Sequence, residues 1–422
     1  MRKQAETALW RILNKMMNTQ SNQSPQAKFD EALALQQSGD FRAAIERFEL
    51  LLAQLPDNAD IMNLCAICYF QMNNIGRALE MLERAVVTRP DHDDAWNNLG
   101  QLRQELDDHI GASEAYHKVC QLVPDSPHGF INFGNMCQFL ERFEEGALSY
   151  ERALSLEPGQ PEVWANYART LLYAGDWEKA NQATVKTISL APGHAGALAL
   201  QSIALQELGR MDEWSALVDF DRLIQGQEIA LPAGYSDMTA FNKALCDHCI
   251  NHPSLEYEPA DNTTTKGHQT GNLAKADEPG PIGALIDAIN TAVGTYRERH
   301  PIDPAHPYLA QRPKQWDFDI WGTVLSSQGH QASHIHRSAW LSGVYYAGLP
   351  DVISGDDTDH IGWIEFGHPQ SYPETKSEPV VKHYPPKEGT MFLFPSYLYH
   401  RTVPFESSDR RVSIAFDLLA KA

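Results

Sequence analysis

Three histidines near the C-terminus have the residue types and spacing of a metal-centred oxidation site. His334 and His336 are one residue apart in SHIHRSAWLSGVYY, and His400 ends TMFLFPSYLYH, 64 residues later. With 17 histidines in 422 residues, about one H-x-H is expected by chance, so the pair alone predicts little. The distant third histidine makes the set a candidate metal centre, because imidazole nitrogens bind transition metals well.

An arginine follows the third histidine closely enough to lie on the next strand. Eleven residues after His400 the chain reads RVSIAF. If this segment is a strand, its alternation places Arg411 and Ser413 on one face and Arg410 on the other. An arginine with a serine two residues later is a rigid, charged holder for a carboxylate. Beside three candidate iron ligands, this pair predicts a bidentate organic acid as cosubstrate.

The segments around these residues are typical of short strands. They read WDFDIWGTVL, WLSGVYYAGL, GWIEFG, VVKHYPP, GTMFLFPSYLYH and RRVSIAFDLL. Turn residues separate them and no helical crossover intervenes, so we expect an antiparallel sandwich or jelly roll. Helical spacing in DMTAFNKALCDHCINH and IGALIDAINTAVGTYRERH predicts flanking helices, with the polar, turn-rich EPADNTTTKGHQTGNLAKADEPGP between them. The other nearby histidines lack ligand spacing and are expected in loops: His330, His360, His368 and His383.

At these residues the sequence resembles the iron(II)/2-oxoglutarate-dependent dioxygenases, over roughly residues 241–422. Their double-stranded β-helix carries H-x-D/E, a distant histidine, and an arginine about ten residues further on. The resemblance implies Fe(II), 2-oxoglutarate and O2 as cofactor and cosubstrates. Tyr346 is a candidate contact by analogy with the tyrosine-rich strand of prolyl hydroxylases. The implied site residues are His334, His336 and His400 for the metal, and Arg411, Ser413 and Tyr346 for 2-oxoglutarate.

His336 departs from that pattern, which has aspartate or glutamate at this position. A neutral imidazole leaves one more positive charge on the iron site and should change its metal affinity. Three-histidine iron sites exist in other dioxygenases, but the same change could also mark an inactive site. The carboxylates of Asp356, Asp357, Asp359 and Glu365 are close in sequence, yet their spacing gives no specific support for a fourth ligand.

The first half of the chain is a repeat. Prolines recur every 34 residues, at Pro56, Pro90, Pro124, Pro158 and Pro192. At one position of the repeat the residues are large and apolar, and at two other positions they are small. This pattern is typical of a helix-turn-helix unit that buries its apolar faces by stacking on its neighbours. These residues resemble the tetratricopeptide repeat family, in about five units over roughly residues 25–192 and a degenerate sixth to about residue 214.

One polar column of the repeats suggests what they hold. Asn98, Asn132 and Asn166 share one register, in WNNLG, FINFG and WANYA. Amides repeated along a groove can pair with the backbone of an extended peptide, which the resemblance to tetratricopeptide repeats also implies. The alternative is that these asparagines satisfy polar groups within the stack.

We therefore expect a multidomain α + β protein: an α-solenoid of tetratricopeptide repeats followed by a double-stranded β-helix (jelly-roll, cupin-like) domain with flanking helices. The expected boundaries are 1–24 for a helical or disordered segment, 25–214 for the solenoid, 215–240 for a connection and 241–422 for the dioxygenase-like domain.

Bulk composition limits the partners. The formal charge of −21 argues against nucleic acid or an anionic membrane as the main partner. No apolar stretch approaches the ~18 residues of a membrane span. Six cysteines in so long a chain favour a reducing, cytoplasmic setting. The C-x-x-C pairs, Cys65 with Cys68 and Cys246 with Cys249, are interpreted as helix packing rather than zinc or redox sites.

The function expected from these features is a 2-oxoglutarate-dependent hydroxylase whose repeats recruit a protein or peptide substrate. Two alternatives stay open. The chain could be an interaction scaffold with a degenerate oxygenase domain, or a three-histidine iron dioxygenase that oxidises a small molecule without 2-oxoglutarate.

Overall fold

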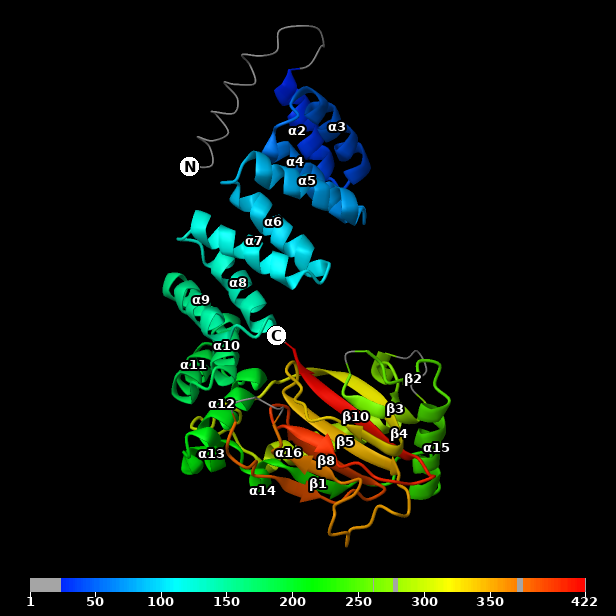
Figure 1. The fold of residues 1–422 in the computed structure, drawn as a ribbon. Coiled ribbons are helices and arrows are strands. Elements are labelled where there is room, and N and C mark those ends of the chain that lie inside the picture. Colours follow the sequence, from blue (N-terminus) through cyan, green and yellow to red (C-terminus); the bar gives the residue numbers. More distant parts are fainter. Residues whose placement is uncertain (1–23, 261, 276–279, 370–374, 422) are drawn as a thin grey trace. The chain divides into compact units, whose positions relative to one another are not determined.

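The computed structural model describes residues 24–260, 262–275, 280–369 and 375–421 (Figure 1). The predicted N-terminal segment therefore lies, apart from Ser24, outside the described residues. Contacts divide the chain into two compact units, one ending at Pro158 and the other beginning at Gly159. No helix in the described ranges is long and apolar enough to cross a membrane.

The first unit is a stack of antiparallel helix pairs. Its helices are α2 (Pro25–Gln37), α3 (Phe41–Gln54), α4 (Ala59–Gln71), α5 (Ile75–Thr88), α6 (Asp93–Glu105), α7 (His109–Leu122), α8 (Pro127–Phe139) and α9 (Phe143–Leu156). Side-chain caps start several of them; Asn58 Oδ1, for example, accepts a hydrogen bond from Ile61 N at 3.0 Å.

The small residues of the repeat register allow the two helices of a pair to touch. A Cβ built at Gly100 would lie 2.8 Å from the ring of Tyr116, and one at Gly134 would lie 3.0 Å from the ring of Tyr150. Both tyrosines are buried. The alternation of large and small residues in the sequence therefore reflects how α6 packs on α7 and α8 on α9.

The second unit begins with more helices of the same kind and continues into the β-domain. The helices are α10 (Pro161–Tyr173), α11 (Trp177–Leu190), α12 (Ala195–Glu207), α13 (Met211–Leu217) and the short α14 (Phe220–Leu223). The end of α12 is joined to the β-domain through Glu207, whose carboxylate accepts the backbone N–H groups of Lys376 and Ser377 at 3.0 and 3.1 Å. Tyr397 Oη donates to Leu217 O at 2.6 Å.

The β-domain consists of two antiparallel sheets. The larger has the strand order β1-β8-β5-β10-β4-β3-β2 and the smaller β7-β6-β9. The strands are β1 (Gln225–Glu228), β2 (Glu256–Tyr257), β3 (Thr264–Gln269), β4 (Trp316–Gln331), β5 (Leu341–Gly348), β6 (Ile364–Phe366), β7 (Lys382–Tyr384), β8 (Thr390–Pro395), β9 (His400–Thr402) and β10 (Arg411–Ala420). Both β4 and β5 pair with β10, which lies at the centre of the larger sheet.

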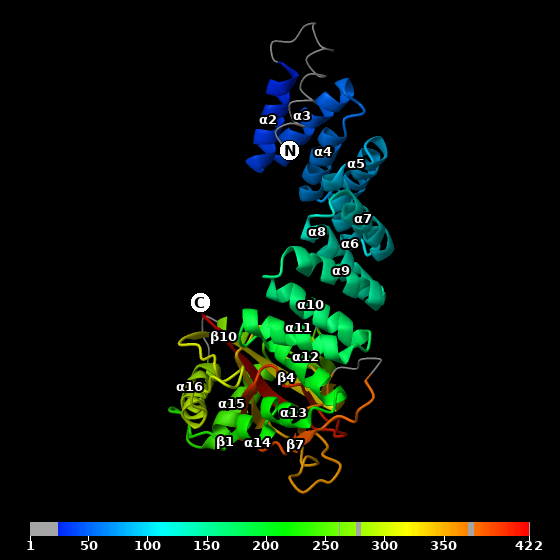
Figure 2. The same ribbon diagram turned by 90° about the vertical axis from the view of Figure 1, so that its left-hand side faces the viewer.

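Two helices cover one face of the larger sheet, α15 (Met238–Ile250) and α16 (Pro281–Arg299), with the 3-10 turn η1 (Leu273–Lys275) beside them (Figure 2). Tyr345 Oη donates to Asn242 Oδ1 on α15 at 2.5 Å. Gly322 leaves room for Cys249, since a Cβ there would lie 2.5 Å from Sγ. Residues that alternate with Tyr345 and Gly322 therefore point to the opposite, inner face.

The predicted fold class is confirmed: a helical tetratricopeptide-repeat array precedes a β-sheet-rich domain of oxygenase type. Three strands were not expected from the sequence: β1, β3 and the two-residue β2. β1 lies in the stretch assigned to the connection, and β3 lies in the segment predicted to be turn-rich. Both are polar and lack a strand pattern of their own, so their conformation comes from pairing with β8 and β4.

Candidate metal centre and cosubstrate site

The three histidines come together at one end of the small sheet. His334 and His400 form an antiparallel bridge in which each N–H donates to the other's carbonyl at 3.1 Å. Directly paired residues point to the same face, so both rings project inward. His336, two residues further on, is fixed by its N–H donating to Ser396 O at 3.0 Å. The ligating atoms of the three rings all lie within 4.8 Å of one another.

Each ring has its Nδ1 atom occupied, and this fixes which nitrogen faces the others. Nδ1 of His334 lies 2.7 Å from Ala332 O and that of His400 lies 3.0 Å from Leu398 O. Nδ1 of His336 lies 2.9 Å from Asp417 Oδ2. All three oxygens are acceptors, so each Nδ1 carries the proton and each Nε2 presents a lone pair.

The spacing of the free nitrogens fits a metal. Nε2 of His336 lies 3.2 Å from Nε2 of His400. Two ligands bound at about 2.1 Å and about 90° apart are themselves about 3 Å apart. The His336 and His400 nitrogens therefore have the separation of two ligands of one metal ion, and the His334 ring lies close enough to add a third, with an oxygen behind each ring that fixes its orientation.

Burial keeps two of the rings uncharged. It lowers the pKa of His334 to about 4, with the neighbouring His336 acting in the same direction. Burial likewise holds the pKa of His400 well below its usual value, again reinforced by the other two rings. Phe394 and Phe366 lie against His400, at ring-centroid distances of 4.7 and 5.9 Å. Neutral imidazole is the form that binds metals.

Arg411 lies fully inside the domain at the start of β10. It is 2% exposed, and its Nη1 donates to Ser413 Oγ at 3.2 Å. Its guanidinium lies over the ring of Tyr346, 5.0 Å from the centroid. Among the described residues no carboxylate forms an ion pair with it, and burial lowers its pKa. A buried cation of this kind fits an anionic ligand, because leaving the charge uncompensated is costly. Arg410, by contrast, is exposed.

Register places further donors beside Arg411 on the inner face. Ser413 is paired with Thr323 on β4 and with Tyr346 on β5. Thr323 Oγ1 and Trp321 Nε1 are buried without a hydrogen-bond partner in the described part of the chain, and the buried Tyr346 hydroxyl interacts with the Arg411 side chain. Burial raises the pKa of Tyr346 to about 12, so its hydroxyl keeps its proton. Every one of these groups can donate to a carboxylate, which only accepts.

Thr323 and Trp321 were not predicted as site residues. Their strand was recognised, but the inward phase of β4 is visible only once its register with β10 is known. Trp321 also lies 5.7 Å, centroid to centroid, from His336. Trp321 therefore lies beside His336, and Thr323 lies beside Ser413, on the inner face of β4.

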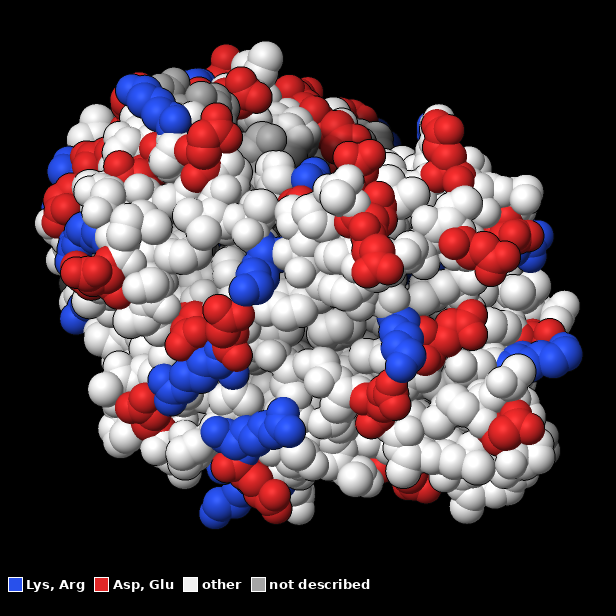
Figure 3. Space-filling view, turned by 90° about the horizontal axis from the view of Figure 1, so that it is seen from below, with Lys and Arg blue, Asp and Glu red and all other residues white. Residues whose placement is uncertain are grey.

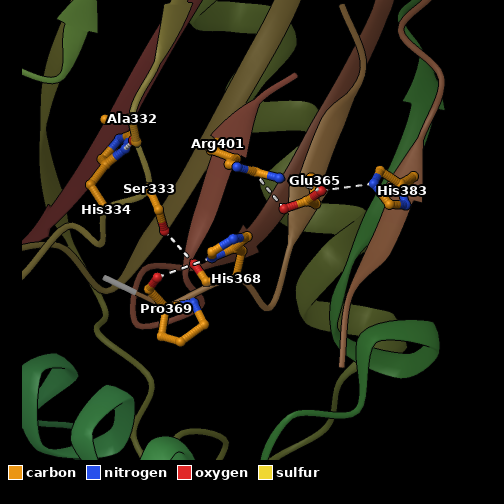
Figure 4. Close-up of polar contacts among 8 residues, drawn as sticks. All are labelled: Ala332, Ser333, His334, Glu365, His368, Pro369, His383 and Arg401. Atoms are coloured by element: carbon orange, nitrogen blue, oxygen red, sulfur yellow. Dashed lines mark hydrogen bonds and ion pairs between the residues drawn. The ribbon is translucent and has the colours of Figure 1, made fainter. Parts of the chain in front are cut away.

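The neighbouring carboxylates do not join the metal cluster. Glu365 points to the other face of the small sheet, between Arg401 and His383 (Figure 4). Arg401 Nε and Nη2 donate to it at 2.6 and 3.0 Å, and His383 Nε2 lies 2.8 Å away. Burial alone would raise the pKa of Glu365, but Arg401 and His383 bring it below its usual value. Asp357 is used locally, accepting from Ile361 N at 2.6 Å.

An open cavity of about 920 Å³ lies elsewhere on the domain, lined by residues that include Tyr384, Phe392 and Thr390. None of the three histidines lines it. Phe392, which lines the cavity, packs against Tyr346 at a ring-centroid distance of 6.1 Å. The cavity therefore adjoins the candidate cosubstrate residue Tyr346, although the three histidines are not part of its lining.

The asparagine column is engaged within the repeats. Asn98 Nδ2 donates to Asn63 Oδ1 at 2.8 Å, and Asn132 Nδ2 donates to Asn97 Oδ1 at 3.3 Å. Both acceptors belong to the preceding repeat. Asn166 lies at the matching position of α10, in the second unit. Each of these hydrogen bonds uses one of the two donors of an amide, so peptide binding by this column stays a prediction.

The cysteine pairs are free thiols. Cys65, Cys68 and Cys249 are buried, and burial raises their pKa values to about 12, 11 and 12. Thiols of this kind pack as small apolar side chains and are poor nucleophiles.

Comparison with known protein families gives matches in both the N-terminal and the C-terminal part of the chain. Residues 319–417 match the family described as "Putative 2OG-Fe(II) oxygenase". Residues 35–126 and 149–182 match two tetratricopeptide repeat families. The chain thus has tetratricopeptide repeats in its N-terminal part and a 2OG-Fe(II) oxygenase family domain with a histidine triad in its C-terminal part. The predicted resemblance is confirmed, and the family implies Fe(II) and 2-oxoglutarate, although the triad is not the usual H-x-D motif.

Solved structures similar to the chain each cover about two fifths of it. "YrrB: a TPR protein with an unusual peptide-binding site" is 17% identical over 41% of this chain and 91% of that one, with a TM-score of 0.39. The MamA protein is 19% identical over 39% and 91%, with a TM-score of 0.37. MamA from Desulfovibrio magneticus RS-1 is 14% identical over 39% and 94%, with a TM-score of 0.36. The search of curated proteins gave no match.

Proposed function

We propose that the protein is an Fe(II)- and 2-oxoglutarate-dependent dioxygenase that hydroxylates a side chain of a protein or peptide recruited by its repeats. The observation that carries this proposal is the combination of three convergent imidazoles, one of them held by Asp417 of β10, with a buried arginine on the same face of β10 that has no carboxylate partner among the described residues. A histidine cluster alone would suit many metals, and a buried arginine alone would suit many anions. Together they provide for a metal and for a dianionic acid beside it.

The roles of the residues follow from their positions. His334, His336 and His400 would hold iron through Nε2. Arg411 and Ser413 would bind the distal carboxylate of 2-oxoglutarate, with Tyr346 and Thr323 donating hydrogen bonds to it. When bound, iron with O2 and 2-oxoglutarate supplies the oxidant that removes a substrate hydrogen, and the acid leaves as succinate and CO2.

Apolar walls would keep water from the reacting atoms. Phe394 and Phe366 pack against His400, and Val344 lies on the inner face opposite Ala415. Excluding water strengthens the ionic grip of Arg411 on its ligand and protects the oxidant from side reactions.

The repeats would supply the substrate rather than the chemistry. A partner segment held by the repeats raises the local concentration of its side chains for the same chain's oxygenase domain. The net charge of −21 favours a segment that is not acidic. On the face shown in Figure 3, acidic and basic side chains are interspersed and the described residues form no continuous basic area, which favours a protein partner over nucleic acid.

The test is oxidation by the purified full chain. Incubated with Fe(II), 2-oxoglutarate, O2 and a peptide extract, it should form succinate, and mass spectrometry should find a peptide that has gained one oxygen atom. His400→Ala should abolish both products. Succinate formation without any oxidised peptide would point to a small-molecule substrate. No succinate from a correctly folded protein would favour the scaffold alternative and contradict the proposal.

A further inference from the structure

His336 is held from behind by a buried carboxylate. Its Nδ1 lies 2.9 Å from Asp417 Oδ2, and the side chains of the two residues are 14% and 11% exposed. Asp417 is held in turn by Ser342, whose Oγ donates to Oδ1 at 2.6 Å. In the described part of the chain no lysine or arginine forms an ion pair with Asp417. The partner of its Oδ2 atom there is the His336 ring.

The sheet explains why this carboxylate reaches the metal centre. Asp417, Ala415, Ser413 and Arg411 alternate along β10 and share the inner face. Asp417 is paired with Ser342 on β5 and with Asp319 on β4. The strand that holds the buried cation at one end thus holds a buried anion at the other, next to the histidines.

The three histidines are not supported equally. Nδ1 of His334 and of His400 each face a neutral backbone carbonyl. Only His336 faces a carboxylate, and His336 is the residue that stands where the family pattern has a charged ligand. The missing negative charge is therefore present, one side chain further from the metal.

We infer that Asp417 is a positioning residue that supplies, through His336, the negative charge that the metal centre would otherwise lack. The inference rests on the proposed function. A carboxylate accepting from Nδ1–H fixes the ring orientation and makes Nε2 a stronger donor to a cation. The site then behaves as a histidine–carboxylate pair plus two histidines, rather than as three equivalent imidazoles.

The test is metal affinity, independent of turnover. Co(II) is titrated into the full-length apo protein under argon, with binding followed by its visible absorption. Asp417→Asn keeps the shape and an acceptor oxygen but removes the charge, and it should weaken Co(II) binding by roughly 10–100-fold. Asp319→Asn is the matched control: it removes a neighbouring carboxylate from the same face that forms no hydrogen bond or ion pair with His336 in the described structure, and it should change binding less than about threefold.

A rescue variant separates charge from folding. Restoring a carboxylate at the ligand position in the double variant His336→Asp with Asp417→Asn should recover most of the wild-type Co(II) affinity, which a damaged fold would not allow. Equal affinity of wild type and Asp417→Asn would overturn this inference and leave the proposed metal site standing. Absence of Co(II) binding by the wild type would overturn both.

Discussion

Nε2 of His336 and Nε2 of His400 lie 3.2 Å apart, and both rings already use Nδ1 on other oxygens. Two lone pairs that face each other at this distance repel unless a proton or a cation lies between them. The protein thus holds the two rings in an arrangement that a bound metal ion would stabilise, and this has consequences for stability as well as for chemistry.

Metal should stabilise the folded chain through these rings. At a free Mn(II) concentration 100 times the dissociation constant, the gain is about 2.7 kcal/mol, or a rise in Tm of roughly 5 °C or more for a unit of this size. Differential scanning calorimetry with and without Mn(II) measures it. His400→Ala should lose the shift, whereas His330→Ala, on β4 but outside the triad, should retain it. An equal shift in both variants would place the metal elsewhere.

Arg411 should matter for ligand binding and not for folding. Arg411→Met removes a buried charge that has no carboxylate partner in the described residues, so the free energy of unfolding of the ligand-free protein should stay the same or rise by about 1 kcal/mol. The affinity for 2-oxoglutarate should fall by roughly 30-fold or more as charge-assisted hydrogen bonds are lost.

Urea denaturation and isothermal titration calorimetry with the metal-loaded protein measure the two quantities. Arg410→Met, at the exposed neighbouring position, is the control and should change neither. A loss of several kcal/mol of stability in Arg411→Met would mean that the guanidinium is a structural partner instead.

The buried histidines should make the metal-free protein acid-sensitive. The pKa of His334 is about 4 in the folded protein against an ordinary value of 6.5. Between these values the unfolded chain binds a proton that the folded chain does not, so stability is complete above about pH 6.5 and is lost as the pH falls toward 4. The contribution of His334 is up to roughly 3 kcal/mol.

Other groups also titrate in this range, so the informative quantity is the difference between wild type and His334→Asn. Urea denaturation at several pH values gives the free energy of unfolding of each protein. As the pH falls, the value for His334→Asn should rise relative to that for the wild type. A difference that is constant with pH would show that His334 titrates normally.

The asparagine column offers a test of substrate recruitment. Asn98→Ala removes a 2.8 Å hydrogen bond to Asn63, and should cost about 1 kcal/mol of stability whatever its role. If Asn98 also binds substrate, KM for an identified oxidised peptide should rise at least fivefold, an amount typical of a lost hydrogen bond, with kcat unchanged. If KM does not change, the asparagines serve the packing of the repeats alone.

Much of the fold, and the set of histidines in the candidate metal centre, can be predicted from the sequence. The 34-residue period predicts the repeats because stacking imposes the same packing on every unit, as Gly100 against Tyr116 illustrates. The shared face of Arg411 and Ser413 follows from strand alternation. The predicted loop positions of His330 and His383 were wrong. His330 lies in β4, which continues beyond its apolar residues, and His383 lies in β7, within the segment VVKHYPP that has strand character in the sequence.

Contacts that depend on the register of the strands could not be predicted from the sequence. Asp417 is 81 positions from His336 and has no motif of its own. Its role appears only when β10 is paired with β4 and β5. Thr323 is hidden for the same reason, and β1 and β3 become strands only because β8 and β4 offer them partners.

The absorption spectrum of the anaerobic complex tests the proposed iron and 2-oxoglutarate site most directly. Fe(II) and 2-oxoglutarate added together to the wild-type protein should produce a weak metal-to-ligand charge-transfer band in the visible region, which requires the acid to chelate iron. The band should be reduced by Arg411→Ala and abolished by His400→Ala. Folded wild-type protein that binds Fe(II) and 2-oxoglutarate without this band, or that binds neither, would contradict the proposed site.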